Sequence, residues 1–140
     1  MKNKLDHMTK NIVITDDCNF ERKNEEEFKD FSDIVSYIAT NQKHILIHGM
    51  AGVGKSVLSR MIKDWYNQNG RELIITSSTG LSALNIGGIT IHRYIKMCGD
   101  KGIKFDVLID EIGFLSGNDF FSVVRLLKND VRLIMVGDLK

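Results

Sequence analysis

The sequence of 140 residues has no proline, only two cysteines and no hydrophobic run that approaches the length of a membrane span. Cys18 and Cys98 match no metal-ligand spacing, which indicates free thiols in a reducing compartment. Residues 1–17 contain no apolar core long enough for a signal peptide, so we expect an intracellular protein, cytoplasmic or elsewhere in the cell, without a membrane partner. For the absence of proline we find no functional reason.

The charge balance is close to neutral. The chain has 19 basic and 18 acidic side chains, and its net charge of +1 gives no global signature of nucleic-acid binding. Any such binding must therefore come from a local site. With 43% hydrophobic and 26% charged residues, the composition is typical of one folded globular domain and excludes a disordered chain.

A glycine-rich loop fits the phosphate-binding pattern G-x-x-x-x-G-K-[ST] at every fixed position. Its residues are Gly49, Met50, Ala51, Gly52, Val53, Gly54, Lys55 and Ser56. The apolar run 44–48 predicts a buried strand before the loop, and the spacing of apolar residues from 57 to 65 predicts a helix after it. Between a strand and a helix, backbone N–H groups converge on one anion. The alternative is a glycine-rich turn that merely carries a lysine.

The phosphate-binding interpretation gives roles to two side chains of the loop. Lys55 is expected to reach the β- and γ-phosphates of a nucleotide, as a binding and catalytic group. The hydroxyl of Ser56 is expected to ligate Mg²⁺. The loop therefore predicts a nucleotide site with a divalent metal ion.

Four apolar runs alternate with segments of helical periodicity. The predicted strands span residues 44–48, 72–76, 105–109 and 132–136. The predicted helices begin at Asn24, follow the glycine-rich loop, span 81–86 and 90–97, and begin again at Asn118. Thr90 is the predicted N-cap of the helix at 90–97. Continuous apolar strands that alternate with helices predict an α/β fold, a parallel sheet of about four strands with helices on both faces.

The first and last predicted helices each have an apolar face that we expect to pack inward. In the first helix this face is formed by Phe28, Phe31, Val35 and Ile38, and in the last by Phe120, Val123, Val124 and Leu127. The acidic run 25–27 is interpreted as a solvated first turn of the helix rather than as a catalytic group.

In a parallel sheet the functional residues follow the carboxyl ends of the strands. The third predicted strand ends in Asp110 and Glu111. Asp110 is expected to hold Mg²⁺ opposite Ser56, and Glu111 to act as the catalytic base that orients and polarises the attacking water. The alternative is an exposed acidic pair at the end of a strand. Asp138, after the fourth strand, is either a γ-phosphate contact or an ordinary polar strand end.

Four hydroxyl residues follow the second predicted strand. Thr76, Ser77, Ser78 and Thr79 offer hydroxyl and N–H groups without charge, which suits contacts to a sugar-phosphate backbone. A Ser/Thr-rich helix cap explains them equally well. His92, together with Arg93 and Lys96, adds positive potential for DNA binding on the same side, although a single histidine near a helix start is usually structural.

The segment from Thr76 to His92 resembles the petite-integration-frequency family of superfamily 1 DNA helicases, which are relatives of the RecD-type enzymes. Residues 49–56 are similar to helicase motif I, residues 107–116 to motif II and residues 133–140 to the start of motif III. The resemblance implies a partial RecA-like P-loop NTPase domain at residues 24–140, preceded by an N-terminal extension at 1–23.

The resemblance implies ATP-driven unwinding of DNA with 5′-to-3′ movement. ATP and Mg²⁺ are then the cofactors, bound by Lys55 and Ser56, and single-stranded or forked DNA is the partner, contacted by residues 76–79. Asp110 and Glu111 serve hydrolysis. A second RecA-like domain, in cis or from a partner chain, is expected to supply arginine fingers, which in such enzymes raise the rate by about 10³ to 10⁵.

The sequence departs from the family pattern in the helix before motif I and in motif III. Residues 25–28 include no adenine-recognising glutamine, Leu139 stands where proline is usual, and the chain ends at Lys140 before the motif III glutamine. A second hypothesis is therefore a non-catalytic nucleotide- or DNA-binding module from a truncated helicase gene, and a P-loop kinase is a third. The family topology predicts strand order 1-4-3-2, with residues 44–48 at an uncovered sheet edge.

Overall fold

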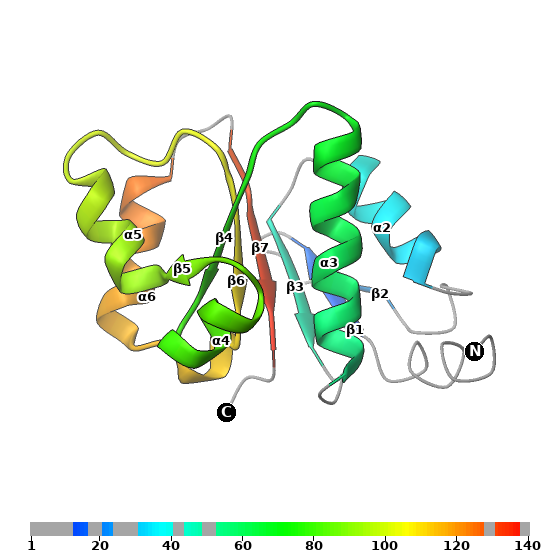
Figure 1. Ribbon diagram of the computed structural model, residues 1–140, viewed down its shortest axis with the longest axis horizontal. Coiled ribbons are helices and arrows are strands. Elements are labelled where there is room, and N and C mark those ends of the chain that lie inside the picture. Colours follow the sequence, from blue (N-terminus) through cyan, green and yellow to red (C-terminus); the bar gives the residue numbers. More distant parts are fainter. Residues whose placement is uncertain are drawn as a thin grey trace.

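The computed structural model describes residues 13–16, 21–23, 31–40, 44–48, 53–127 and 131–137. A central sheet has helices on both of its faces (Figure 1). Five of its strands are parallel: β3 (Ile45–His48), β7 (Leu133–Val136), β6 (Asp106–Asp110), β4 (Leu73–Ser77) and β5 (Ile89–Thr90). The order β3-β7-β6-β4 confirms the predicted order of the four main strands, and the α/β fold class is confirmed with it.

The predicted uncovered edge at residues 44–48 is wrong. Strand β1 (Val13–Asp16) pairs antiparallel with β3, and β2 (Glu21–Lys23) pairs antiparallel with β1. The hairpin satisfies backbone groups of β3 that an open edge would leave to solvent. Its short apolar run carried no periodicity from which a strand could be predicted.

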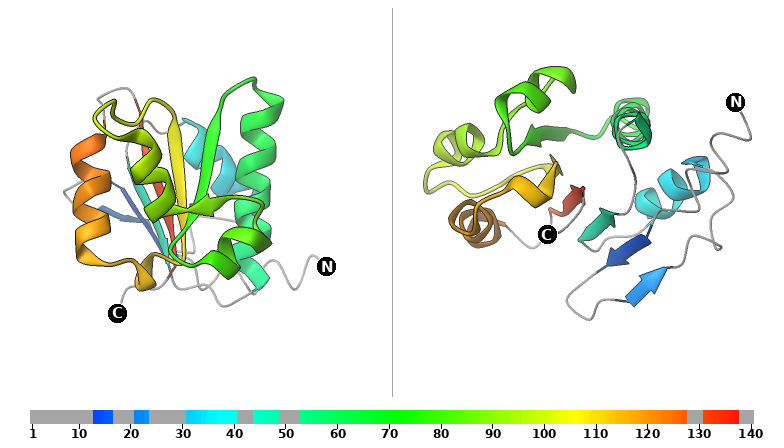
Figure 2. Two further views of the ribbon diagram at one scale, coloured as in Figure 1. Left: turned by 60° about the vertical axis from the view of Figure 1, so that its left-hand side comes forward. Right: turned by 90° about the horizontal axis from the view of Figure 1, so that it is seen from below.

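The helices form two pairs on opposite faces of the sheet (Figure 2). Helices α2 (Phe31–Thr40) and α3 (Val53–Gln68) cover one face, and α5 (Ile91–Cys98) and α6 (Gly117–Leu126) cover the other. The short helix α4 (Gly80–Asn85) follows β4, and the 3-10 turn η2 (Ile112–Phe114) follows β6. Among the described residues we find no helix with both the length and the apolar composition of a transmembrane segment.

Successive side chains of the central strands enter the two cores alternately. Ile45 and Ile47 of β3 pack with α2 and α3, whereas Leu46 packs on the opposite face. In β6, Leu108 faces the first core, and Val107 and Ile109 face the second. Because both faces are buried, the strands are apolar without interruption, as the sequence indicated.

Helix α6 differs from its prediction at its start and on its inner face. Ser116 is the N-cap and accepts a hydrogen bond from the backbone N–H of Asp119, so the helix begins before Asn118. Phe120 and Val124 are exposed, which corrects their predicted inward orientation. Val123 is buried and Leu127 is partly buried, as predicted, and Leu126 packs against the same core. In α2, Val35 and Ile38 are buried as predicted, while Phe28 lies outside the described residues.

The amino-terminal end of the sheet is held by a buried polar network around Asp106. One carboxylate oxygen of Asp106 accepts hydrogen bonds from the Tyr66 hydroxyl at 2.7 Å and from Nη2 of Arg71 at 3.1 Å. The other accepts from the backbone N–H of Arg132 at 3.1 Å. Burial, and then the bond to Asp106, raise the pKa of Tyr66. This network ties α3, β6 and β7 together at the end of the sheet opposite the predicted site.

Candidate nucleotide site

The predicted phosphate loop has the strand and the helix that its chemistry requires. Strand β3 ends at His48 and helix α3 begins at Val53. Residues Gly49, Met50, Ala51 and Gly52 lie outside the described residues. Val53, Gly54, Lys55 and Ser56 form the first turn of α3. The first N–H groups of an α-helix have no partner within the helix, so a first turn at the carboxyl edge of a sheet is a position at which helices bind anions.

Asp110 and Glu111 lie at the carboxyl end of β6. Asp110 is the last residue of the strand, and it is only 6% exposed. One of its carboxylate oxygens accepts a hydrogen bond of 2.9 Å from the backbone N–H of Glu111. Glu111 has φ 54° and ψ 49°, and it is the sole non-glycine residue with positive φ in the described part of the chain. Such a left-handed conformation costs about 1–3 kcal/mol, so surrounding contacts must hold it.

Hydrogen bonds to the carbonyl oxygen of Glu111 fix this conformation. The Ser78 hydroxyl donates to it at 2.7 Å, and the backbone N–H of Phe114 donates to it at 3.0 Å. The backbone N–H of Ser78 also donates to the carbonyl of Asp110 at 3.3 Å. The acidic pair is therefore attached to the start of the hydroxyl segment that follows β4.

Gly137 lies between the end of β3 and the acidic pair. Its N–H donates to the carbonyl of Ile47 at 2.9 Å. A Cβ at Gly137 would stand 2.9 Å from the backbone nitrogen of Ile112 and 3.2 Å from the Cα of Glu111. The strand that leads into the phosphate loop and the turn that carries Glu111 are thus separated by one glycine. The sequence pattern Gly-Asp marked this position, but not its contact with Glu111. Asp138 lies outside the described residues.

The hydroxyl segment is largely engaged inside the protein. Thr76 and Ser77 have no exposed surface, and their hydroxyls donate to the carbonyls of Leu108 at 2.9 Å and Asp110 at 3.4 Å. Thr79 is the N-cap of α4 and accepts from the N–H of Ser82 at 3.3 Å. Surface available to a ligand therefore belongs to Ser78 and Thr79, which are half-buried.

His92 lies on the exposed side of α5, in its first turn. Its side chain is 63% exposed, and Nδ1 is 3.4 Å from Oδ1 of Asp119 on α6. Thr90 caps α5 as the spacing predicted, since its side chain accepts from the N–H of Arg93 at 3.2 Å. The histidine is thus accessible beyond β5, which runs beside the end of β4.

The donors predicted for a metal ion suit magnesium. Asp110 and Ser56 offer hard oxygen ligands, and Mg²⁺ commonly takes one or two protein oxygens and completes its shell with water and phosphate. In the described ranges, no three His, Cys, Asp or Glu side chains gather into a metal-binding group. The chemistry of the site therefore fits a metal ion that arrives with a nucleotide, rather than a closed protein cage.

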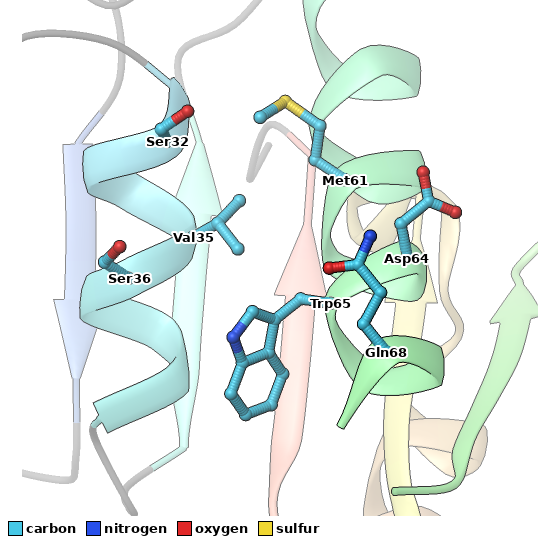
Figure 3. Close-up of a pocket in the computed structure, with 7 residues that line it drawn as sticks. All are labelled: Ser32, Val35, Ser36, Met61, Asp64, Trp65 and Gln68. Atoms are coloured by element: carbon cyan, nitrogen blue, oxygen red, sulfur yellow. The ribbon is translucent and has the colours of Figure 1, made fainter. Parts of the chain in front are cut away.

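A separate cleft of about 350 Å³ lies between α2 and α3 (Figure 3). Val35 points from α2 toward the cleft, and the indole of Trp65 points from α3 toward α2. The described residues that line it include Asp64 and Gln68 but no lysine or arginine. Without positive charge on these residues, the cleft does not suit a phosphate.

Comparison with known proteins decides the family of the chain. Residues 31–140 match the family described as AAA domain. The chain belongs to this family. The match contains all five parallel strands of the AAA domain together with α2 to α6, whereas the β1–β2 hairpin precedes it.

Several relatives with similar sequences are named helicases. The ATP-dependent DNA helicase RRM3 of Saccharomyces cerevisiae is 33% identical over 136 residues, which cover 75% of this chain and 19% of that protein. The first four curated relatives are all ATP-dependent DNA helicases of the Pif1 and Rrm3 type, and the chain spans between 8% and 28% of their length. The resemblance to the petite-integration-frequency family is confirmed.

Solved structures agree with this fold. Pif1 helicase from Candida albicans has a TM-score of 0.60 and 25% identity, over 77% of this chain and 31% of that one. A Bacteroides Pif1 bound to ssDNA has a TM-score of 0.57 and 22% identity, over 78% of this chain and 31% of that one. The AAA domain of this chain therefore has the architecture of the corresponding part of these helicases.

Proposed function

We propose that the chain binds ATP with Mg²⁺ at the carboxyl edge of its sheet and hydrolyses the terminal phosphate, as part of a 5′-to-3′ DNA helicase motor. The observation that carries this proposal is the position of Gly137. This residue contacts the end of β3, which leads into the phosphate loop, and also the turn of Glu111. This approach of the end of β3 to the turn of Glu111 supports the proposal that phosphate-binding groups and a carboxylate share one small region.

Each residue of the region has one role in the proposed reaction. Lys55 and the N–H groups of the first turn of α3 hold the phosphates. Ser56 and Asp110 would hold Mg²⁺, which neutralises charge that develops on the phosphate oxygens. Glu111 orients the attacking water and accepts its proton. The buried Asp110 is oriented by the N–H of Glu111, so the two carboxylates have different tasks.

The proposed DNA contacts follow from the relatives and from accessibility. The relatives are named DNA helicases, and one structural neighbour is bound to ssDNA. Of the residues predicted to contact the DNA backbone, Ser78, Thr79 and His92 have accessible surface. We assign the contacts to a single strand or fork to these three. Thr76 and Ser77 have a positioning role, because their hydroxyls bond to carbonyls of β6 and so hold the chain that leads to Ser78 and Thr79.

The motor function requires a second RecA-like domain, supplied in cis or by a partner chain. Such a domain would close over the nucleotide and bring arginine fingers to the γ-phosphate. The proposed domain at residues 24–140 would then carry motifs I, Ia and II with the start of motif III. The residues before it, which include the β1–β2 hairpin, would be an extension that covers the edge of the sheet.

Single-turnover hydrolysis of radiolabelled ATP, with and without a single-stranded oligonucleotide, tests the proposal. We expect DNA to stimulate hydrolysis, and Lys55→Ala to abolish it. Lys101→Ala, at an exposed lysine of the loop before β6, is the matched control and should behave as the parent. Nucleotide binding without turnover would instead favour the second candidate, a non-catalytic nucleotide-binding module.

A further inference from the structure

A second cavity, of about 500 Å³, lies between α3, α4 and β4. It is lined by successive turns of α3 from Ser59 to Asn67, by Ile75 of β4, and by Asn85 to Gly87 at the end of α4. Its volume is in the range of small-molecule sites. The residues that line it are different from the phosphate-loop and acidic residues of the proposed nucleotide site.

The floor of this α3–α4 cavity contains an unsatisfied polar group. Ser59 is 4% exposed, and its hydroxyl has no hydrogen-bond partner among the described residues. It is the sole buried side-chain oxygen or nitrogen in the described ranges with this property. An unpaired buried hydroxyl is unfavourable because it loses its hydrogen bonds to water, so native proteins rarely retain one without a use. Because this hydroxyl has less than 1 Å² of accessible surface, rotation about the Cα–Cβ bond would bring it to a ligand atom in the cavity, which would then supply the missing partner.

The walls of the α3–α4 cavity carry an excess of positive charge and of hydrogen-bond donors. Arg60 and Lys63 come from α3, and Asp64 is the one carboxylate among the described lining residues. The ammonium of Lys63 lies 3.8 Å from the position that a Cβ of Gly87 would take, so it extends from α3 to the turn after α4. A phosphate group, which offers only acceptor oxygens, is the ligand that such a set of donors suits.

The rest of the cavity suits a flat, partly apolar group with polar edges. Ile75 and Ile86 give an apolar surface, and the amides of Asn67 and Asn85 offer both donors and acceptors beside it. Asparagine amides pair well with the edges of nucleobases. The turn after α4 packs closely against β4, because a Cβ at Gly88 would stand 2.2 Å from the carbonyl oxygen of Ile75.

We propose that the α3–α4 cavity binds a nucleoside phosphate, with its phosphate at Ser59, Arg60 and Lys63 and its base against Ile75 and Ile86. The ligand is either a free mononucleotide or one nucleotide of a nucleic-acid strand. The proposal is independent of ATP hydrolysis at the phosphate loop. Among the described residues that line the cleft between α2 and α3, there is neither a lysine or arginine nor an unpaired buried hydroxyl.

Equilibrium binding of two probes tests this proposal, in protein that carries Lys55→Ala so that the phosphate loop does not compete. The probes are AMP, followed by calorimetry, and a fluorescein-labelled oligothymidylate of eight nucleotides, followed by anisotropy. In this background Ser59→Ala should raise the Kd about tenfold, as expected for a lost hydrogen bond to a charged group. Lys63→Gln should raise it about five- to tenfold, and Lys101→Gln, at an exposed lysine outside the cavity, should leave it unchanged.

The two probes separate the two sources of the ligand. If Ser59→Ala and Lys63→Gln raise the Kd of both probes, the cavity accepts a free nucleotide. If they raise only the Kd of the oligonucleotide, the ligand is one nucleotide of a strand. The proposal is overturned if the protein that carries only Lys55→Ala binds neither probe. It is also overturned if adding Ser59→Ala or Lys63→Gln leaves both Kd values unchanged.

The thermal midpoint without ligand gives an independent readout. Because Ser59→Ala removes an unpaired buried hydroxyl, it should raise the midpoint or leave it unchanged. A lower midpoint would show that the hydroxyl has a partner within the protein, and would overturn the proposal even if binding weakened. Loss of hydrolysis in Lys55→Ala has no effect on these outcomes, so the cavity and the phosphate loop are tested separately.

Discussion

The hydroxyl of Ser78 donates a hydrogen bond of 2.7 Å to the carbonyl oxygen of Glu111. This bond joins the segment proposed to contact DNA to the residue proposed to activate water. Glu111 is in a left-handed conformation that its own side chain disfavours, so its position depends on such contacts. A displacement of the chain at Ser78 by DNA would therefore be transmitted directly to Glu111.

Removing the Ser78 hydroxyl should weaken this connection. We expect Ser78→Ala to lower the free energy of unfolding by about 1 kcal/mol, the usual value of one hydrogen bond, and to reduce the stimulation of hydrolysis by single-stranded DNA. Urea unfolding and single-turnover assays measure the two effects. Ser122→Ala is the control, because that hydroxyl bonds to Asn118 within the same helix. Equal stimulation in Ser78→Ala and parent would refute the connection.

The strain at Glu111 should be visible in stability. Glycine adopts a left-handed conformation freely, and this relief exceeds the added entropy of the unfolded chain. We therefore expect Glu111→Gly to raise the free energy of unfolding by about 0.5–1 kcal/mol while it abolishes hydrolysis. Glu72→Gly, at an exposed residue without positive φ, should lower stability. If Glu111→Gly lowers the free energy of unfolding, contacts of the Glu111 side chain stabilise the fold by more than its left-handed backbone conformation destabilises it.

The close approach at Gly137 should exclude any side chain. Alanine there would combine φ +135° with a Cβ that lies 2.9 Å from the backbone nitrogen of Ile112. We expect Gly137→Ala to lower the free energy of unfolding by about 2–4 kcal/mol and to weaken ATP binding. Gly80→Ala has no atom within 4 Å of its new Cβ, and should be close to neutral. Parent-like nucleotide binding in Gly137→Ala would contradict the proposed role of this contact.

His44 should make the stability of the fold dependent on pH. Its Nδ1 accepts a hydrogen bond of 2.9 Å from the N–H of Leu133, which requires an unprotonated nitrogen. Burial, followed by the nearby Arg132 guanidinium, lowers the pKa of His44 below its ordinary value of 6.5. The unfolded chain therefore binds a proton first as the pH falls, so stability should decrease below about pH 6.5 and level off once the folded histidine is also protonated.

Urea unfolding between about pH 8 and pH 5 measures this dependence. His44→Asn keeps an acceptor near the N–H of Leu133 that does not titrate in this range, so its stability should fall less steeply with decreasing pH. Identical slopes in the variant and the parent would show that another group controls the acid sensitivity of the fold.

The elements that could be predicted from the sequence are those with a strong local signal. The four main strands are continuous apolar runs because both faces of the sheet are covered. Thr90 was recognisable as a helix cap from its position alone. In contrast, the apolar residues near Val13 were too few to predict β1, whose pairing with β3 depends on the rest of the sheet.

The finer features of the site depend on contacts between distant segments. The pattern of four hydroxyls after β4 was compatible with ligand contacts and with caps, and only the packing of β4 against β6 shows that Thr76 and Ser77 are fully used internally. Similarly, no local pattern predicts positive φ at a glutamate. The conformation of Glu111 follows from bonds with Ser78 and Phe114 and from the space left by Gly137.

The division of roles between Lys55 and Glu111 is tested most directly by measuring ATP binding and single-turnover hydrolysis in the same preparations. We expect Lys55→Ala to lose ATP binding, because the phosphates lose their main positive charge. Glu111→Gln should bind Mg²⁺-ATP with a Kd close to that of the parent and lose hydrolysis, because an amide cannot accept the proton of water. Hydrolysis at the parental rate in Glu111→Gln, or parental ATP binding in Lys55→Ala, would show that these two residues do not have the proposed roles.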